Sequence, residues 1–406
     1  MLDHDALNRI HAAAASQRDA LIGFARRAVK TPSPSGQEGA MADLVRREME
    51  RVSFDDVWVD DVGNVVGVVR GTGGGRRVLF NSHLDQVAEG DPARWSHPPF
   101  GAEIVDGVLY GRGASDVKGA LAAQVYLAAA LLGAGLRPDG DVFVAAVVLE
   151  EVGGFGTEWL CRTLPCDVCV LGEPTGNELR RGHRGRAVIA VSFAGRSVHA
   201  SVPNRDGNPH FALARFIERL DGLRLPSDSV FGGSSLAPTV IGSDQESANV
   251  TPGTLRLLLD YRSLPSEDVS ATVDRLRELA VASCGGHVSA TVRAEGWTVR
   301  TYTGVEATMP PKVGYELPVD HPKLLAAQRT LESALERPIP VDVWHFTTDG
   351  GILARHGVPT IGFSPCEEQY PHTVQDQVSL AKMAQAVVGN AALAVSLSDR
   401  DDGRGT

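Results

Sequence analysis

The chain has 406 residues, of which 43% are hydrophobic, a length sufficient for two domains and a composition normal for a globular protein. Its formal net charge of −11 argues against nucleic acid or an anionic membrane as the main partner. The charged residues Asp3, Asp5 and Arg9 leave no apolar signal-peptide core, and no apolar run approaches the roughly 20 residues of a membrane span. We therefore expect a cytoplasmic protein.

The first part of the chain alternates helical and strand-like segments. Apolar residues from Leu21 to Val29 follow helical spacing. Further helices are predicted over residues 38–52 and 120–132, and strands over residues 57–59, 65–69, 78–80, 142–149 and 168–171. The strand over 142–149 is apolar along its whole length, as expected where helices cover both faces of a sheet. This alternation predicts an α/β fold with a mixed, mostly parallel sheet flanked by helices.

A different pattern begins near residue 184. Strands are predicted over residues 186–194, 236–241, 254–262 and 287–293, and helices over 209–220 and 268–282. The pattern then returns to a helix over 322–335, a strand over 358–363 and a helix over 380–396. We expect residues 184–298 to form an inserted α+β domain, and residues 1–183 and 299–406 to form the two parts of a larger domain.

Five short segments with metal-binding side chains are the most informative feature. They are Ser82-His83-Leu84-Asp85, Ser115-Asp116, Glu150-Glu151, Gly172-Glu173-Pro174 and Pro371-His372. Four of them follow strand-like runs, and Asp116 lies in a glycine-rich turn before a helix. Ligands of an open α/β sheet gather at the carboxyl ends of its strands. The pattern therefore predicts a mixed nitrogen and oxygen site for divalent metal.

Each segment alone has an ordinary explanation. Asp116 could cap a helix, Glu150 and Glu151 could be a solvated pair in a loop, and His83 could be a buried histidine held by Asp85. Their joint position at the ends of strands favours a functional metal site over these separate explanations. Two metals about 3.5–4 Å apart convert a bridging water to a hydroxide near neutral pH, and a free carboxylate can take its proton and pass it to a leaving amine.

These motifs resemble the di-zinc metallopeptidase superfamily of aminoacylase, acetylornithine deacetylase, succinyl-diaminopimelate desuccinylase and glutamate carboxypeptidase. The resemblance includes Gly111–Gly119, Gly172–Thr175 and the other ligand segments, in the family's order along nearly the whole chain. The runs Arg181–Arg186 and Tyr302–Gly304 are most similar to a branch of selenium-metabolism hydrolases. The resemblance implies that the inserted domain is a lid that also forms a homodimer.

The resemblance also implies a role for each site residue. His83 and Glu173 would bind one metal, Glu151 and His372 the other, and Asp116 would bridge them. Glu150 would be the general base, Asp85 would orient His83, and His199 of the lid would stabilise the oxyanion in the partner's active site. The implied substrate-binding residues are Asn249, Arg262 and, more loosely, Thr347. An ordinary surface position remains an alternative for His199 and for Arg262.

The expected substrate is a small N-acyl amino acid or dipeptide, and an N-carbamoyl amino acid is an alternative. Zinc is the expected metal, although cobalt and manganese accept the same ligands. A catalytically silent metal-binding relative is a second alternative, but Glu150 is present. A dinucleotide-binding loop at Gly111–Gly119 is disfavoured, because its spacing is not G-x-G-x-x-G and Asp116 would oppose a pyrophosphate.

Overall fold

The strands that are apolar on both faces lie at the centre of a nine-stranded sheet. In the computed structural model, which describes residues 2–400, the strand order is β1 (Asp56–Val59), β2 (Val65–Val69), β6 (Val142–Val147), β3 (Val78–His83), β7 (Val168–Leu171), β19 (Thr360–Gly362), β8 (Leu179–His183) and β17 (Tyr315–Glu316), with β18 (Val341–Trp344) also paired to β8. The central strands β6, β3, β7 and β19 are parallel, and the outer pairs β1–β2, β2–β6 and β8–β17 are antiparallel.

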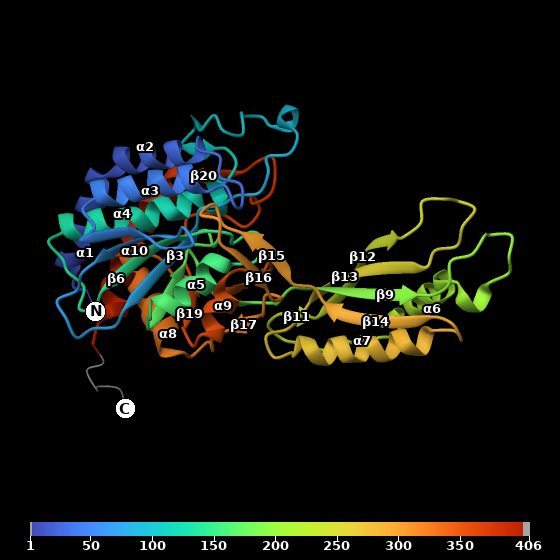
Figure 1. Ribbon diagram of the computed structural model, residues 1–406. Coiled ribbons are helices and arrows are strands. Elements are labelled where there is room, and N and C mark those ends of the chain that lie inside the picture. Colours follow the sequence, from blue (N-terminus) through green and yellow to red (C-terminus); the bar gives the residue numbers. More distant parts are fainter. Residues whose placement is uncertain (1, 401–406) are drawn as a thin grey trace.

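Helices cover both faces of this sheet (Figure 1). On one face lie α1 (His4–Ser16), α2 (Arg18–Val29), α3 (Gly39–Arg51), α4 (Gly119–Gly133), α8 (Pro322–Leu335) and α10 (Leu380–Ser398), and on the other lie α5 (Phe155–Thr163) and α9 (Gly350–Arg355). Successive strand residues alternate between the two cores, so Val144 packs on the first set and Phe143 on the second. The predicted α/β fold with a mixed, mostly parallel sheet is confirmed.

Helix α10 has the length and apolarity of a membrane span. Two thirds of its most apolar window (67%) is buried inside the protein, where it packs between α4 and α8. The sequence-based expectation that no run approaches membrane length is therefore wrong for this segment, and the burial of α10 identifies it as a core helix.

The inserted segment, called the lid below, forms a separate lobe beside the larger lobe (Figure 1). Its four-stranded sheet has the order β12 (Ser235–Ser243), β13 (Thr254–Arg262), β9 (Ala187–Ala194) and β14 (Ser289–Ala294), all antiparallel. Helices α6 (Pro209–Asp221) and α7 (Val269–Ser283) pack on it around their own core. Strand β12 is an edge strand whose Val240 and Ile241 are more than half exposed, at 53% and 59%.

Shorter elements complete the fold. They are β4 (Glu103–Val105), β5 (Val108–Tyr110), β10 (Ser227–Asp228), β11 (Gly232–Gly233), β15 (Trp297–Arg300), β16 (Glu306–Met309), β20 (Gln377–Ser379), and the short turns η1 (Pro92–Arg94), η2 (Ala114–Lys118) and η3 (Arg205–Gly207). The chain enters the lid just after Arg186 and returns after β14, and Arg186 forms an isolated antiparallel bridge with Lys312.

Two differences from the predicted elements bear on the site. The strand predicted over 142–149 ends at Val147, because Leu149 has a left-handed φ of 60° that a strand does not accommodate. Glu150 and Glu151 therefore lie in a turn and not in extended backbone. Helix α5 was not predicted, since Gly153 and Gly154, which precede it, are typical of a loop.

Candidate metal centre

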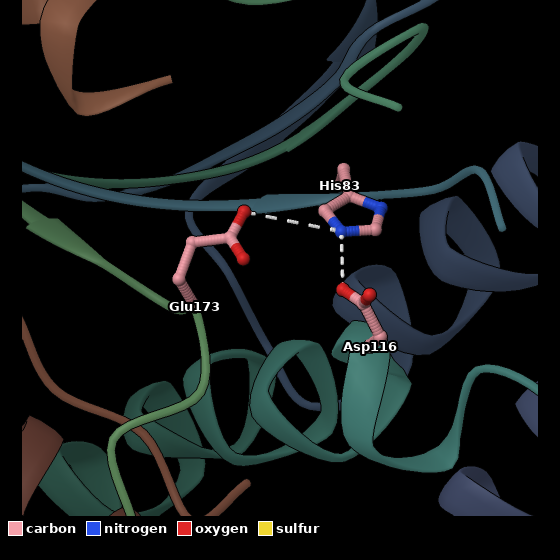
Figure 2. A group of neighbouring side chains, drawn as sticks. All are labelled: His83, Asp116 and Glu173. Carbon is pink, nitrogen blue, oxygen red and sulfur yellow. Dashed lines mark hydrogen bonds and ion pairs between the residues drawn. The ribbon is translucent and has the colours of Figure 1, made fainter. Parts of the chain in front are cut away.

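Asp116 lies between two groups of metal-binding side chains. Its Oδ1 is 3.1 Å from Nε2 of His83, and its Oδ2 is 3.0 Å from Nε2 of His372. The first group is completed by Glu173, whose Oε1 lies 3.9 Å from His83 Nε2; Figure 2 shows these three residues converging. The second is completed by Glu151, whose Oε2 lies 3.1 Å from His372 Nε2. Within each group the ligand atoms lie within 4.8 Å of one another, so one carboxylate connects two sites.

The sheet brings these residues together. His83 ends β3, Glu173 follows β7, and β3 and β7 are parallel neighbours. Their carboxyl ends therefore face the same side, as predicted. His372 comes from the loop before β20 and has a left-handed φ of 61°, a conformation that non-glycine residues adopt mostly where the surroundings hold them.

The loop that carries Asp116 is fixed by a carboxylate from the segment after His372. Asp376 accepts hydrogen bonds from the main-chain N–H groups of Gly113 at 2.7 Å and Ser115 at 2.8 Å, and from Arg112 at 3.1 Å. Gly113 has a φ of 82°, which favours glycine, and the Asp116–Val117 peptide is cis. One buried side chain thus positions the bridging residue relative to His372.

Asp85 holds His83 through its main chain. Nδ1 of His83 lies 2.9 Å from the main-chain oxygen of Asp85 and 3.4 Å from its Oδ1. This contact directs Nε2 toward Asp116 and Glu173, which is the orientation a metal-binding histidine needs. The Asp85 carboxylate itself accepts from Ser35 Oγ at 2.7 Å and from the N–H groups of Glu150 and Glu151.

The chemistry of the donor set fits two divalent metal ions. The Asp116 and Glu151 carboxylates raise the pKa of His372 to about 10, and burial with the nearby Glu150 carboxylate raises the pKa of Glu173 well above its usual range. With these raised pKa values the side chains bind protons, and the protons compensate the negative charge of the cluster as metal cations would. Within residues 2–400, Oε1 of Glu151 is buried and has no hydrogen-bond partner, as a free ligand atom would be.

Glu150 points away from Glu151. Its Oε1 accepts a short hydrogen bond from Lys312 Nζ, whereas Glu151 faces His372. Burial raises the pKa of Glu150 to about 8, against the opposing effect of the Lys312 ammonium. A buried carboxyl with a pKa near neutrality is suited to take up and release a proton.

A pocket of about 530 Å³ opens over the two metal-binding groups. Predicted residues Glu150, Arg262 and Thr347 line it together with four of the metal-binding side chains, Asp116, Glu151, Glu173 and His372. Arg262 donates to Asp260 at 2.6 Å, and Arg186, which also lines the pocket, donates to the other oxygen of Asp260 at 3.1 Å. Apolar walls come from Val152, Trp297, Phe346 and Pro371.

His199 and Asn249 are not brought to this pocket. Both are exposed, and they lie beside each other in the lid, where the Ala200 N–H donates to the Asn249 carbonyl oxygen at 2.8 Å. Asn249 precedes β13, and Arg262 ends it. A nine-residue strand extends roughly 30 Å, so Asn249 and Arg262 of one chain lie far apart, and the predicted role of Asn249 in substrate binding stays a prediction.

Sequence reasoning missed Lys312, Arg186 and Trp297. Arg186 lies between β8 and β9 and Lys312 between β16 and β17, where the two residues form an isolated bridge, and Trp297 begins β15 just after the lid. Arg186 ends the run Arg181–Arg186, whose resemblance carried no site role, and Lys312 and Trp297 lie within no recognisable motif. Only the folded arrangement of these segments brings the three residues to the pocket.

Comparisons with known proteins agree with this arrangement. A model of peptidase family M20/M25/M40 matches residues 79–395. A succinyl-diaminopimelate desuccinylase of Cereibacter sphaeroides is 30% identical over 378 residues, which cover 87% of this chain and 93% of that protein.

Solved structures share the fold. The di-peptidase Dug1p of Saccharomyces cerevisiae superimposes with a TM-score of 0.75 at 12% identity, over 98% of this chain and 100% of that one. The YXEP protein of Bacillus subtilis, a dinuclear metal-binding peptidase, superimposes with a TM-score of 0.70 at 15% identity, over 95% and 100% of the two chains.

Proposed function

The chain belongs to peptidase family M20/M25/M40 and is a metal-dependent hydrolase of amide or peptide bonds, and we propose that its substrate is a small N-acyl amino acid or dipeptide with a free carboxylate beside the scissile bond. The observation that carries this proposal is the position of Arg262, which lines the same pocket as Glu150 and the metal-binding side chains. A guanidinium pairs with a carboxylate through two parallel hydrogen bonds.

Two divalent ions are the cofactors that the ligand set accepts. His83 and Glu173 would hold one, Glu151 and His372 the other, and Asp116 would contact both. Bound there, the ions would supply Lewis-acid polarisation of the substrate carbonyl and acidify water. We propose zinc as the native metal, since His and carboxylate ligands in this number suit it.

Glu150 is proposed to move the proton. Its carboxylate takes a proton from the attacking water and gives it to the leaving nitrogen, so the departing group leaves as a neutral amine. Asp85 supports this step by holding the Glu150 main chain, and the apolar walls from Trp297 and Phe346 limit water around the reacting groups.

We further propose that the lid forms a homodimer that completes each site with His199 from a second copy. The proposal is supported by two features of the lid. His199 and Asn249 are exposed and lie outside their own chain's pocket, and the edge strand β12 exposes apolar residues and unpaired main-chain groups. His199 would then donate a hydrogen bond to the oxyanion of the tetrahedral intermediate.

A hydrolysis screen on the metal-loaded protein tests the substrate class. N-acetyl, N-succinyl and N-carbamoyl amino acids and dipeptides are each offered with a free and with an amidated carboxylate, and amine release is measured. We expect cleavage of at least one free acid and weak cleavage of its amide. Equal cleavage of both forms would contradict a carboxylate-reading pocket, and release only from N-carbamoyl substrates would move the assignment to that class.

A further inference from the structure

We propose that Lys312 is the positioning residue of Glu150: it holds one carboxylate oxygen of the base so that the other faces the substrate pocket. This inference rests on the proposed function, in which Glu150 moves the proton. It concerns a residue between β16 and β17, outside every segment with metal-binding side chains.

The Lys312 ammonium contacts Glu150 twice and Asp349 once. Nζ donates to the main-chain oxygen of Glu150 at 2.9 Å and to Glu150 Oε1, and it forms an ion pair with Oδ1 of Asp349 at 3.1 Å. Both hydrogen bonds of the ammonium therefore go to the same glutamate. The side chains of Lys312 and Glu150 are only 13% and 10% exposed, so water does not screen the contact.

The two oxygens of Glu150 have different surroundings. Oε1 is engaged by Lys312, whereas Oε2 accepts no hydrogen bond from any residue within 2–400 and is not among the fully buried polar atoms without a partner. Glu150 lines the pocket, so Oε2 remains accessible from it. Because Lys312 also binds the main-chain oxygen of the same residue, it fixes both ends of the glutamate.

The second partner of Lys312 is itself anchored to the central sheet. Asp349 Oδ2 accepts a hydrogen bond from Thr157 Oγ1 at 2.6 Å, and that hydroxyl lies 3.1 Å from Nδ2 of Asn81 in β3. Asp349 is 1% exposed. The chain of contacts from Asn81 to Glu150 therefore ties the base to the strand that carries His83.

The main chain of Lys312 has little freedom. Its carbonyl oxygen accepts the N–H of Arg186 at 2.8 Å, which joins the segment between β16 and β17 to the start of the lid. Two residues further on, Gly314 lies so close to Gly185 that a Cβ on Gly314 would meet the Gly185 nitrogen at 2.8 Å. With its backbone held there, Lys312 delivers its ammonium to Glu150 from a fixed point at the entrance to the lid.

Stability alone does not explain a lysine at this position. Desolvating a buried ion pair costs about as much as its attraction returns, and well-packed apolar residues often stabilise a protein as well. Lys312 lines the catalytic pocket and its partner is the proposed base. The role of Lys312 is therefore to fix the position of the Glu150 carboxylate.

A double-mutant cycle in kcat separates positioning from a general structural effect. Lys312→Met should lower kcat roughly 10- to 100-fold and leave KM within about twofold, since the base is displaced but substrate contacts remain. Lys312→Arg should recover part of the loss. In Glu150→Asp, whose shorter side chain no longer reaches Lys312, adding Lys312→Met should cost less than about threefold.

The controls use the same substrate and metal-loaded proteins. Lys323→Met, on the distant helix α8, should keep wild-type kcat, and metal content by mass spectrometry should stay equal in all variants. Equal losses from Lys312→Met in the wild-type and Glu150→Asp backgrounds would overturn the positioning role, as would a loss of bound metal. A wild-type protein that hydrolyses no substrate in the screen would overturn the proposed function first; an active wild type with no coupling would overturn only the role of Lys312.

Discussion

The carboxylate of Asp85 holds the main chain of Glu150, whose N–H donates to Asp85 Oδ1 at 3.1 Å. Oδ2 of the same carboxylate accepts from the N–H of Glu151 at 3.2 Å. Two adjacent glutamates are thus fixed by one side chain in a turn, and their own side chains diverge. Glu151 reaches His372, and Glu150 reaches Lys312. This divergence gives two adjacent residues of the same type different chemistry.

Substitution of the two glutamates should separate catalysis from metal binding. Glu150→Ala should lower kcat by about a hundredfold or more and keep both metals, because Glu150 belongs to neither group of metal-binding side chains. Glu151→Ala should lower the metal content as well, since its carboxylate belongs to the group with Asp116 and His372. Steady-state kinetics and metal analysis by mass spectrometry measure both effects. If the metal content falls equally in the two variants, the assignment of roles is reversed or wrong.

Removal of metal should abolish hydrolysis and leave the fold. Dialysis against a chelator should bring activity to background, and zinc, cobalt or manganese added back should restore it to different extents. The cores of both lobes are built without the metal-binding side chains, so the far-ultraviolet circular dichroism spectrum should stay unchanged. Full activity in a sample shown to be free of metal would exclude metal-dependent chemistry.

The sequence predicted most of the framework because its elements follow simple periodicities. Helix α8 begins and ends at the predicted residues, and so does β13. The positions of His83 and Glu173 at the ends of parallel strands also followed from their places after apolar runs. In each case the pattern lies within a short stretch of chain.

The parts that could not be predicted depend on contacts between distant segments. The left-handed Leu149 ends its strand early, and nothing in its apolar sequence indicates that conformation. The contact between Lys312 and Glu150 joins residues 162 positions apart and exists only because the chain returns beneath the lid. Asn249 and Arg262 are both implied as substrate-binding residues, and the sequence did not indicate that β13 would separate them within one chain.

Acid should destabilise the protein partly through His183. Burial lowers the pKa of His183 to about 4. In the folded protein its Nε2 accepts a hydrogen bond from the Thr348 N–H, and its Nδ1 lies 2.9 Å from the main-chain oxygen of Arg184. An unfolded histidine has a pKa of about 6.5. Between these values the unfolded chain binds a proton that the folded chain does not. Stability should therefore be constant above about pH 6.5 and fall toward pH 4, by at most roughly 3 kcal/mol from this residue.

His183→Gln removes this titration. We expect the variant to be less stable at pH 7, because contacts with Tyr315 and Thr348 are weakened, and the difference in unfolding free energy from wild type to shrink as the pH falls from 6.5 to 4. Urea unfolding of the metal-free proteins measures it, with the exposed His210→Gln as control. Parallel stability curves for wild type and His183→Gln would show that His183 does not contribute to the acid sensitivity.

Complementation between two inactive variants should reveal sites completed by a second copy. His199→Ala and Glu150→Ala should each be inactive alone. A mixed dimer contains one site with an intact Glu150 that receives an intact His199 from the other subunit. Mixing should therefore restore about a quarter of the wild-type activity per subunit after random exchange, and at most about a half. Native mass spectrometry verifies subunit exchange. Verified mixed dimers without activity would exclude completion across the interface.

Arg262 should read the carboxylate of the substrate with its planar guanidinium. Its Nε is committed to Asp260, which also binds Arg186, so the guanidinium is held in one orientation at the pocket. Arg262→Lys keeps the charge and loses the fork, and should still lower kcat/KM by about tenfold or more. Amidation of the substrate carboxylate should lower the activity of wild type far more than that of Arg262→Ala, because the variant has already lost the partner of that carboxylate.

Arg256→Lys provides a matched control, since Arg256 lies on the same strand, pairs with Glu295 and is absent from the pocket lining. Kinetics with the acid and amide forms of one substrate measure the coupling. Equal sensitivity to amidation in wild type and Arg262→Ala would mean that another group reads the carboxylate, and Arg186, on the opposite side of Asp260, would be the next residue to test.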